Sequence, residues 1–112
     1  MPYDVFLTDD AARDLQELDD YIASNDSPQK ADYVLDSIEE VIKGLAEMPE
    51  RGSYPKELSA LGIHEYREIF FKPYRIIYQT INQRVYVVLI ADGRRDLQDL
   101  LQRRMLANIT KL

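Results

Sequence analysis

Arginines beside two apolar runs are the residues in this sequence best suited to chemistry. Arg75 interrupts the apolar run 74–79, and Arg94 and Arg95 follow soon after the apolar run 85–90. A guanidinium group grips a phosphate or carboxylate with two parallel hydrogen bonds. Arginines gathered at one end of a sheet would therefore suit an anionic substrate or partner. The alternative is that Arg75 only lies on the solvent face of a half-covered antiparallel sheet.

Aromatic and basic side chains are mixed throughout the same region. Arginines that hold phosphates and aromatic rings that stack on bases are the usual parts of a single-stranded nucleic-acid site. Strands also favour aromatic residues for packing alone, so this composition is only weak evidence. The residues are Tyr66, Arg67, Phe70, Phe71, Lys72, Tyr74, Arg75, Tyr78, Arg84 and Tyr86.

Most other chemistry is excluded by composition and motif. The chain has no cysteine and one histidine, which rules out a disulfide framework, a thiol nucleophile and a thiolate metal site. It also lacks a phosphate-binding glycine loop, a nucleophile elbow and a helical His-Glu metal pair. His64 could act as a general acid or base, although a lone loop histidine is usually incidental. We therefore expect neither a metal nor a cofactor.

Charge is divided unevenly along the 112 residues. The net charge is −6, but residues 1–50 carry 14 acids and 3 bases, whereas residues 51–112 carry 6 acids and 11 bases. This division indicates either two surfaces with different tasks or an acidic helical surface that only aids solubility. The chain shows no signal-peptide pattern and no apolar run of membrane-spanning length. We expect a cytoplasmic protein with one domain, residues 1–112.

Two helices should follow a short first strand. Alternating apolar residues predict a strand over 3–7, and Thr8 before two aspartates is typical of a helix N-cap. Ser27 with Pro28 predicts the start of a second helix that runs to about Met48. Both helices carry an apolar stripe, so we expect an antiparallel helical hairpin. The stripes are Ala11, Leu15, Leu18 and Ile22, then Ala31, Leu35, Ile38, Ile42 and Leu45.

The second half of the chain reads as a meander of strands. An irregular connection from Pro49 to about Gly62 leads to expected strands over 66–71, 74–81 and 84–90. Apolar spacing predicts a C-terminal helix through Leu97, Leu100, Leu101 and Leu106. The predicted fold class is α+β in the order β-α-α-β-β-β-α, with the helical hairpin packed on one face of an antiparallel sheet. The cationic parts of that sheet should stay accessible.

This order of elements resembles the RelE/ParE superfamily of bacterial toxins from type II toxin-antitoxin systems. The resemblance covers nearly the whole chain and rests mainly on Tyr74-Arg75-Ile76-Ile77-Tyr78-Gln79 and Ala91-Asp92-Gly93-Arg94-Arg95. It implies a cognate antitoxin and one of two mechanisms. RelE-like members are metal-independent ribonucleases that cut messenger RNA in the ribosomal A site, whereas ParE-like members poison DNA gyrase.

The resemblance also implies roles for individual arginines. For a ribonuclease, Arg67, Arg75 and Arg95 match positions of basic catalytic residues, in the strand before the central one, in the central strand and after the last strand. Such cations would stabilise charge that develops on the phosphate. For a ParE-like toxin, Arg75, Arg94 and Arg95 are the candidates for toxicity or partner binding.

Two positions depart from the ribonuclease pattern. Ile69 stands where those enzymes carry a second catalytic lysine, and Leu101 stands where they place a stacking tyrosine. Tyr66, His64 or Lys72 could substitute through a different geometry. The acidic balance also disfavours docking onto ribosomal RNA.

We therefore favour a gyrase poison held inactive by an antitoxin, with which it could form a hetero-oligomer. The enzymatic alternative is a ribosome-dependent messenger RNA endonuclease. A decayed toxin that serves only as a binding module is a third reading.

Overall fold

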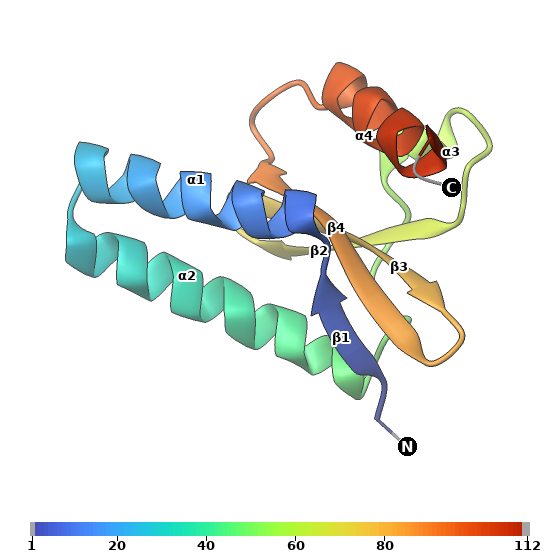
Figure 1. Cartoon of the computed structure of the whole chain (residues 1–112), viewed down its shortest axis with the longest axis horizontal. Helices are drawn as coiled ribbons and strands as arrows, with labels where there is room; N and C mark the ends of the chain where they lie inside the picture. The colour runs from blue at the N-terminus through green and yellow to red at the C-terminus, as the bar shows by residue number, and fades with distance from the viewer. Residues whose placement is uncertain (1, 111–112) are drawn as a thin grey trace.

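A helical hairpin occupies the first half of the chain in the computed structural model, which describes the backbone of residues 2–110 and the side chains of residues 2–105. Helix α1 spans Asp9–Asn25 and α2 spans Pro28–Lys43. The Thr8 hydroxyl accepts a hydrogen bond from the Ala11 amide, and Ser27 caps α2 in the same way. These caps confirm both predicted helix starts, and the two helices lie antiparallel in Figure 1.

The sheet has four strands in the order β1-β4-β3-β2. They span Asp4–Leu7 (β1), Tyr66–Phe71 (β2), Tyr74–Ile81 (β3) and Arg84–Asp92 (β4). Strands β2, β3 and β4 form the predicted antiparallel meander. Strand β1 joins the edge of β4 in parallel, so the sheet is mixed rather than wholly antiparallel. The helical hairpin separates β1 from the other strands, and such a crossover allows a parallel pairing.

One 3-10 turn, one short helix and the C-terminal helix complete the fold. Helix α2 ends earlier than Met48, in a single 3-10 turn η1 over Gly44–Ala46. The irregular connection contains a one-turn helix α3, Lys56–Ser59, which the sequence did not predict. The predicted C-terminal helix is present as α4, Gln98–Thr110. Its expected apolar residue Leu106 lies outside the described side chains.

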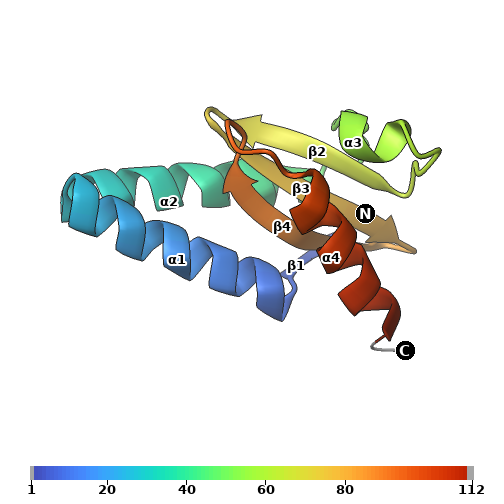
Figure 2. The same ribbon diagram turned by 90° about the horizontal axis from the view of Figure 1, so that it is seen from above.

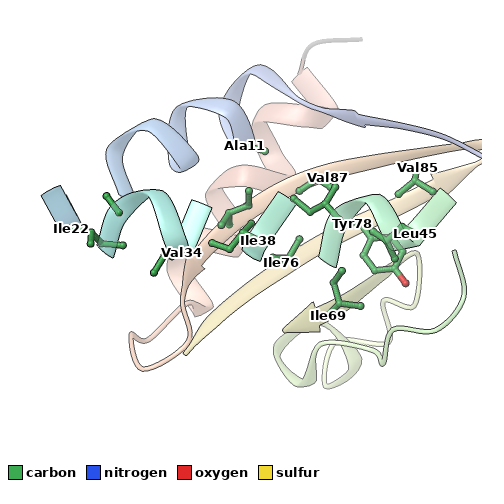
Figure 3. Packing of buried hydrophobic residues seen from close by; sticks show 13 residues of the cluster. Ala11, Ile22, Val34, Ile38, Leu45, Ile69, Ile76, Tyr78, Val85 and Val87 are labelled. Carbon is green, nitrogen blue, oxygen red and sulfur yellow. The ribbon is translucent and has the colours of Figure 1, made fainter. Parts of the chain in front are cut away.

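One face of the sheet packs against the helical hairpin. Figure 3 shows Ile76, Tyr78 and Val87 of the sheet together with Ile38 of α2. All four side chains are almost fully buried. This packing confirms the predicted arrangement of the hairpin on the sheet.

The other face of the sheet is covered by α3 and α4. Leu58 of α3, Leu97 just before α4 and Leu101 within α4 pack against Ile77 and Leu89. Figure 2 shows α4 (red) on the side of the strands away from α2 (teal). The sheet therefore carries a core on each face, and its centre is closed to solvent. No helix within the described part of the chain is long and apolar enough to cross a membrane.

Candidate functional site

Arg75 of β3 lies at the centre of a buried ion triad. Its Nη1 and Nη2 atoms donate to the two carboxylate oxygens of Glu57 in α3, at 2.6 and 2.8 Å. Its Nε donates to Oε1 of Glu68 in β2 at 2.7 Å. Arg75 is 7% exposed. The guanidinium thus already holds two carboxylates, one of them with the bidentate geometry that suits a phosphate.

Local packing fixes the position of this arginine. Gly93 lies over the Arg75 stem, and a Cβ atom at position 93 would come within 2.8 Å of Arg75 Cγ and 2.9 Å of the Pro73 carbonyl. The hydrogen bond from Arg75 holds the pKa of the Glu57 carboxyl below its usual value, although burial acts in the opposite direction. The same hydrogen bond raises the pKa of Arg75. Glu57 and Arg75 are therefore both held in their charged forms at neutral pH.

The expectation of an accessible Arg75 was wrong. From the sequence we expected the cationic parts of the sheet to stay accessible, and the alternative interpretation also left Arg75 on a solvent face. In the structure α3 and α4 cover that face, and α3 supplies Glu57 as a partner. Because two carboxylates surround one guanidinium, the triad does not present a positive charge to solvent.

Arg67 lies on the opposite face of the sheet from Arg75. It is directly opposite Tyr78 in the β2–β3 register, and Tyr78 belongs to the core under the helical hairpin. Its Nη1 donates to the Gly52 carbonyl at 2.8 Å, and its guanidinium stacks over the Tyr54 ring at 4.6 Å from the centroid. The structure therefore does not bring Arg67 and Arg75 together.

Arg94 and Arg95 are exposed on the loop between β4 and α4. Arg94 Nε and Nη2 donate to the Asp92 carboxylate at 3.0 and 2.6 Å. The hydrogen bond from Arg94 is the main cause of the lowered pKa of Asp92. The Arg95 side chain forms no ion pair within the described residues, so it is the more available cation of the two.

The two positions that depart from the ribonuclease pattern are buried in different cores. Ile69 is 6% exposed and belongs to the cluster under the helical hairpin. Leu101 is fully buried in the cluster under α4. They do not share a site, and neither faces solvent.

A cleft that sequence reasoning missed lies between α1 and α4. It has a volume of about 750 Å³, and its walls include Asp14 of α1, Arg104 of α4 and the loop arginines Arg94 and Arg95. Arg104 Nη1 and Nη2 donate to the Asp14 carboxylate at 2.9 and 3.1 Å. The residues are 90 positions apart in sequence, so no local pattern could have paired them.

A family comparison gives these features an identity. The family model described as ParE toxin of type II toxin-antitoxin system, parDE, matches residues 5–97. The chain belongs to the ParE toxin family. It is therefore a toxin of the type II toxin-antitoxin class within the RelE/ParE superfamily. No curated protein sequence matches the chain significantly.

Solved structures share the ParE-like fold at low sequence identity. A protein of the chromosomal ParDE toxin-antitoxin system from P. aeruginosa is 20% identical, with a TM-score of 0.68 over 80% of this chain and 95% of that one. A protein of the RelBE2 toxin-antitoxin complex from Mycobacterium tuberculosis is 21% identical, with a TM-score of 0.58 over 82% and 92%. The E. coli toxin RelE, as an arginine-to-alanine double mutant in the free state, is 15% identical, with a TM-score of 0.64 over 96% and 98%.

Proposed function

We propose that this ParE-family toxin inhibits growth by poisoning DNA gyrase and that a cognate antitoxin neutralises it. The antitoxin is supported by the family itself and by the toxin-antitoxin systems to which the similar structures belong. We propose the cytoplasm as the place of action, because gyrase acts there. A ribosome-dependent messenger RNA endonuclease is the alternative.

The observation that carries this choice is the state of Arg75. A phosphoryl-transfer site needs cations that face the reacting phosphate. Arg75 instead bonds Glu57 and Glu68, and Arg67 lies on the other face of the sheet. With Ile69 and Leu101 buried as core residues, the residues of a RelE-like nuclease do not converge on one surface.

We assign direct contact with the target to Arg94 and Arg95, and an indirect role to Arg75. The two loop arginines are exposed, and Arg95 has no competing carboxylate within the described residues. Arg75 packs beneath Gly93 and so supports the start of the same loop. Toxicity should therefore depend on the positive charge of Arg95, and on Arg75 only because Arg75 holds the loop in place.

The mechanism is tested by inducing the toxin in a sensitive strain. Gyrase poisoning predicts an SOS response and gyrase-linked DNA breaks, with ribosome-bound transcripts left intact. Purified toxin should also inhibit supercoiling by gyrase. Cleavage of ribosome-bound transcripts by the pure protein, abolished by Arg75→Ala, would establish the endonuclease instead.

The contact residue is tested by Arg95→Glu. We expect this variant to lose gyrase inhibition and restore growth, because it reverses the free cation of the loop. Its stability should change by no more than about 0.5 kcal/mol, as is usual at an exposed site. Arg103→Glu, which reverses an exposed arginine on α4, is the matched control and should remain toxic. A folded Arg94→Ala, Arg95→Ala protein with full toxicity would remove both residues from the target surface.

A further inference from the structure

Strand β4 is longer than the strand that covers its outer edge. Its nine residues run from Arg84 to Asp92, but β1 pairs only with residues 84–87. The last contact of this ladder is the Thr8 amide, which donates to the Val87 carbonyl at 3.0 Å. Beyond this point no strand pairs with the outer edge of β4 in the described part of the chain.

Beyond the end of β1, the side chains of Asp14 and Arg104 form hydrogen bonds with the outer edge of β4. Arg104 Nη1 donates to the Val88 carbonyl at 2.7 Å, and the Ile90 amide donates to Asp14 Oδ2 at 3.0 Å. One residue of a parallel strand would do the same with its own N–H and C=O, because it bonds residues i and i+2 of its neighbour. The Asp14–Arg104 ion pair therefore imitates one residue of an added strand.

The same edge continues to Asp92, which lies in the wall of the cleft. Gly93 N donates to the Pro73 carbonyl at 2.8 Å, so the alternation of an antiparallel pair turns the backbone of Asp92 and Ile90 away from β3. A register shift opposite Ile77 and Tyr78 leaves Val88 without a partner in β3. Such a bulge locally bends the strand and re-aims its groups. Residues 88–91 are almost fully buried, and Ile90, Ala91 and Asp92 form part of the lining of the cleft between α1 and α4.

We propose that the antitoxin adds an extended segment to residues 88–92 of β4, in line with β1, and that the Asp14–Arg104 pair is a removable cover of this site. The inference rests on the proposed function for its partner. The incoming backbone replaces Asp14 at the Ile90 amide and Arg104 at the Val88 carbonyl, and it gains the Asp92 amide. Main-chain pairing of this kind supplies affinity without requiring a particular sequence.

Charge selects the kind of segment that fits. Arg104 keeps the Asp14 carboxylate as a partner, but Arg95, which also lines the cleft, has no carboxylate partner among the described residues. An acidic side chain on the segment would pair with the Arg95 guanidinium. The occupant is therefore an extended, acidic segment of the antitoxin.

The direct test follows backbone amides of the wild-type toxin by hydrogen exchange, free and with the antitoxin encoded beside its gene. The Asp92 amide should exchange more slowly in the complex, and the Ile90 amide should stay protected. If the antitoxin neither binds the toxin nor restores growth, the proposed function fails and this inference falls with it. If it binds but leaves exchange at Asp92 unchanged, only the edge site is wrong.

A second test removes Asp14, one of the two residues of the cover. Asp14→Ala removes the group that competes for the Ile90 amide, so antitoxin should bind about two- to tenfold more tightly, the worth of one net hydrogen bond. Glu17→Ala, on the same wall of the cleft, is the control and should not tighten binding. Weaker binding by folded Asp14→Ala would show that Asp14 is a partner contact and would overturn the cover.

A third test closes the cleft in a chain that has no native cysteine. Asp14→Cys, Arg104→Cys protein joined by a short bis-maleimide should lose antitoxin binding, whereas the same protein before joining should bind. Retained binding after joining would exclude the edge as the site.

Discussion

At the scale of single residues, Arg75 joins β3 to α3 and β2 through its ion pairs with Glu57 and Glu68. The sequence predicted that Arg75 lies in the central strand. Phe70 is directly opposite Arg75 on β2, and Glu68, two residues before Phe70, lies on the same face of the sheet. The short turn at 72–73 sets this register, so the sequence could also have predicted that Glu68 lies near Arg75. The contact with Glu57 could not be predicted, because Glu57 comes from an irregular connection whose path depends on Leu58 packing beneath α4. Removing one partner from such a triad leaves a buried charge unpaired, which typically lowers the stability of the fold by about 3–5 kcal/mol.

The triad should make stability depend on acid pH. The pKa of Glu57 is lowered in the folded protein from its ordinary value of 4.5, mainly by the hydrogen bond from Arg75. A lowered carboxyl pKa adds stability above the unfolded value and loses it as pH falls through the folded value. The melting temperature of wild type should therefore exceed that of Glu57→Gln at pH 7, and the gap should narrow below about pH 4.5.

The comparison with Glu57→Gln isolates this one carboxyl because the other acids are common to both proteins. Glu65→Gln, at an exposed position before β2, controls for the loss of one charge. A gap that stays constant from pH 7 to pH 3 would mean that the Glu57 carboxylate does not contribute through its ionisation.

At the scale of elements, local signals predicted well and long-range pairing did not. Thr8 and Ser27 marked the helix starts because a cap is a contact within four residues. The β2–β3–β4 meander followed from short turns, including Asn82, whose φ of 56° lies in the left-handed region that asparagine tolerates. The parallel pairing of β1 with β4 joins residues about 80 positions apart, as in Asp4 with Arg84, and no turn signal encodes it.

Strand β3 also anchors the connection that follows η1. The buried Tyr78 hydroxyl donates to the Pro49 carbonyl at 2.8 Å and accepts from the Gly52 amide at 3.1 Å. Tyr78→Phe would leave both backbone groups without this partner, at a cost of about 1–3 kcal/mol. We expect the melting temperature to fall by about 4 °C for each kcal/mol. Tyr86→Phe, a half-buried tyrosine on β4, should change it little, and equal losses in both variants would refute a special role for Tyr78.

At the scale of the whole molecule, part of the charge division seen in the sequence serves the fold. Arg104 from the basic half pairs with Asp14 and approaches Asp10 of the acidic half, at 2.9 and 3.8 Å. This attraction joins α4 to α1 across the end of β1. The uneven charge along the sequence could not by itself distinguish an internal ion pair from a surface for a partner.

The two cores also decide whether nuclease chemistry could be restored by substitution. Leu101 is fully buried between α4 and the sheet, so a tyrosine there must displace packed side chains instead of reaching a substrate. Overpacking of this kind costs about 1–3 kcal/mol. Leu101→Tyr should therefore lower the melting temperature and should not produce cleavage of ribosome-bound transcripts. Gln102→Tyr, on the exposed side of the same helix, should leave stability within about 0.5 kcal/mol. A Leu101→Tyr protein as stable as wild type that cuts transcripts would show that the face under α4 opens to RNA, and the gyrase proposal would lose the observation that carries it.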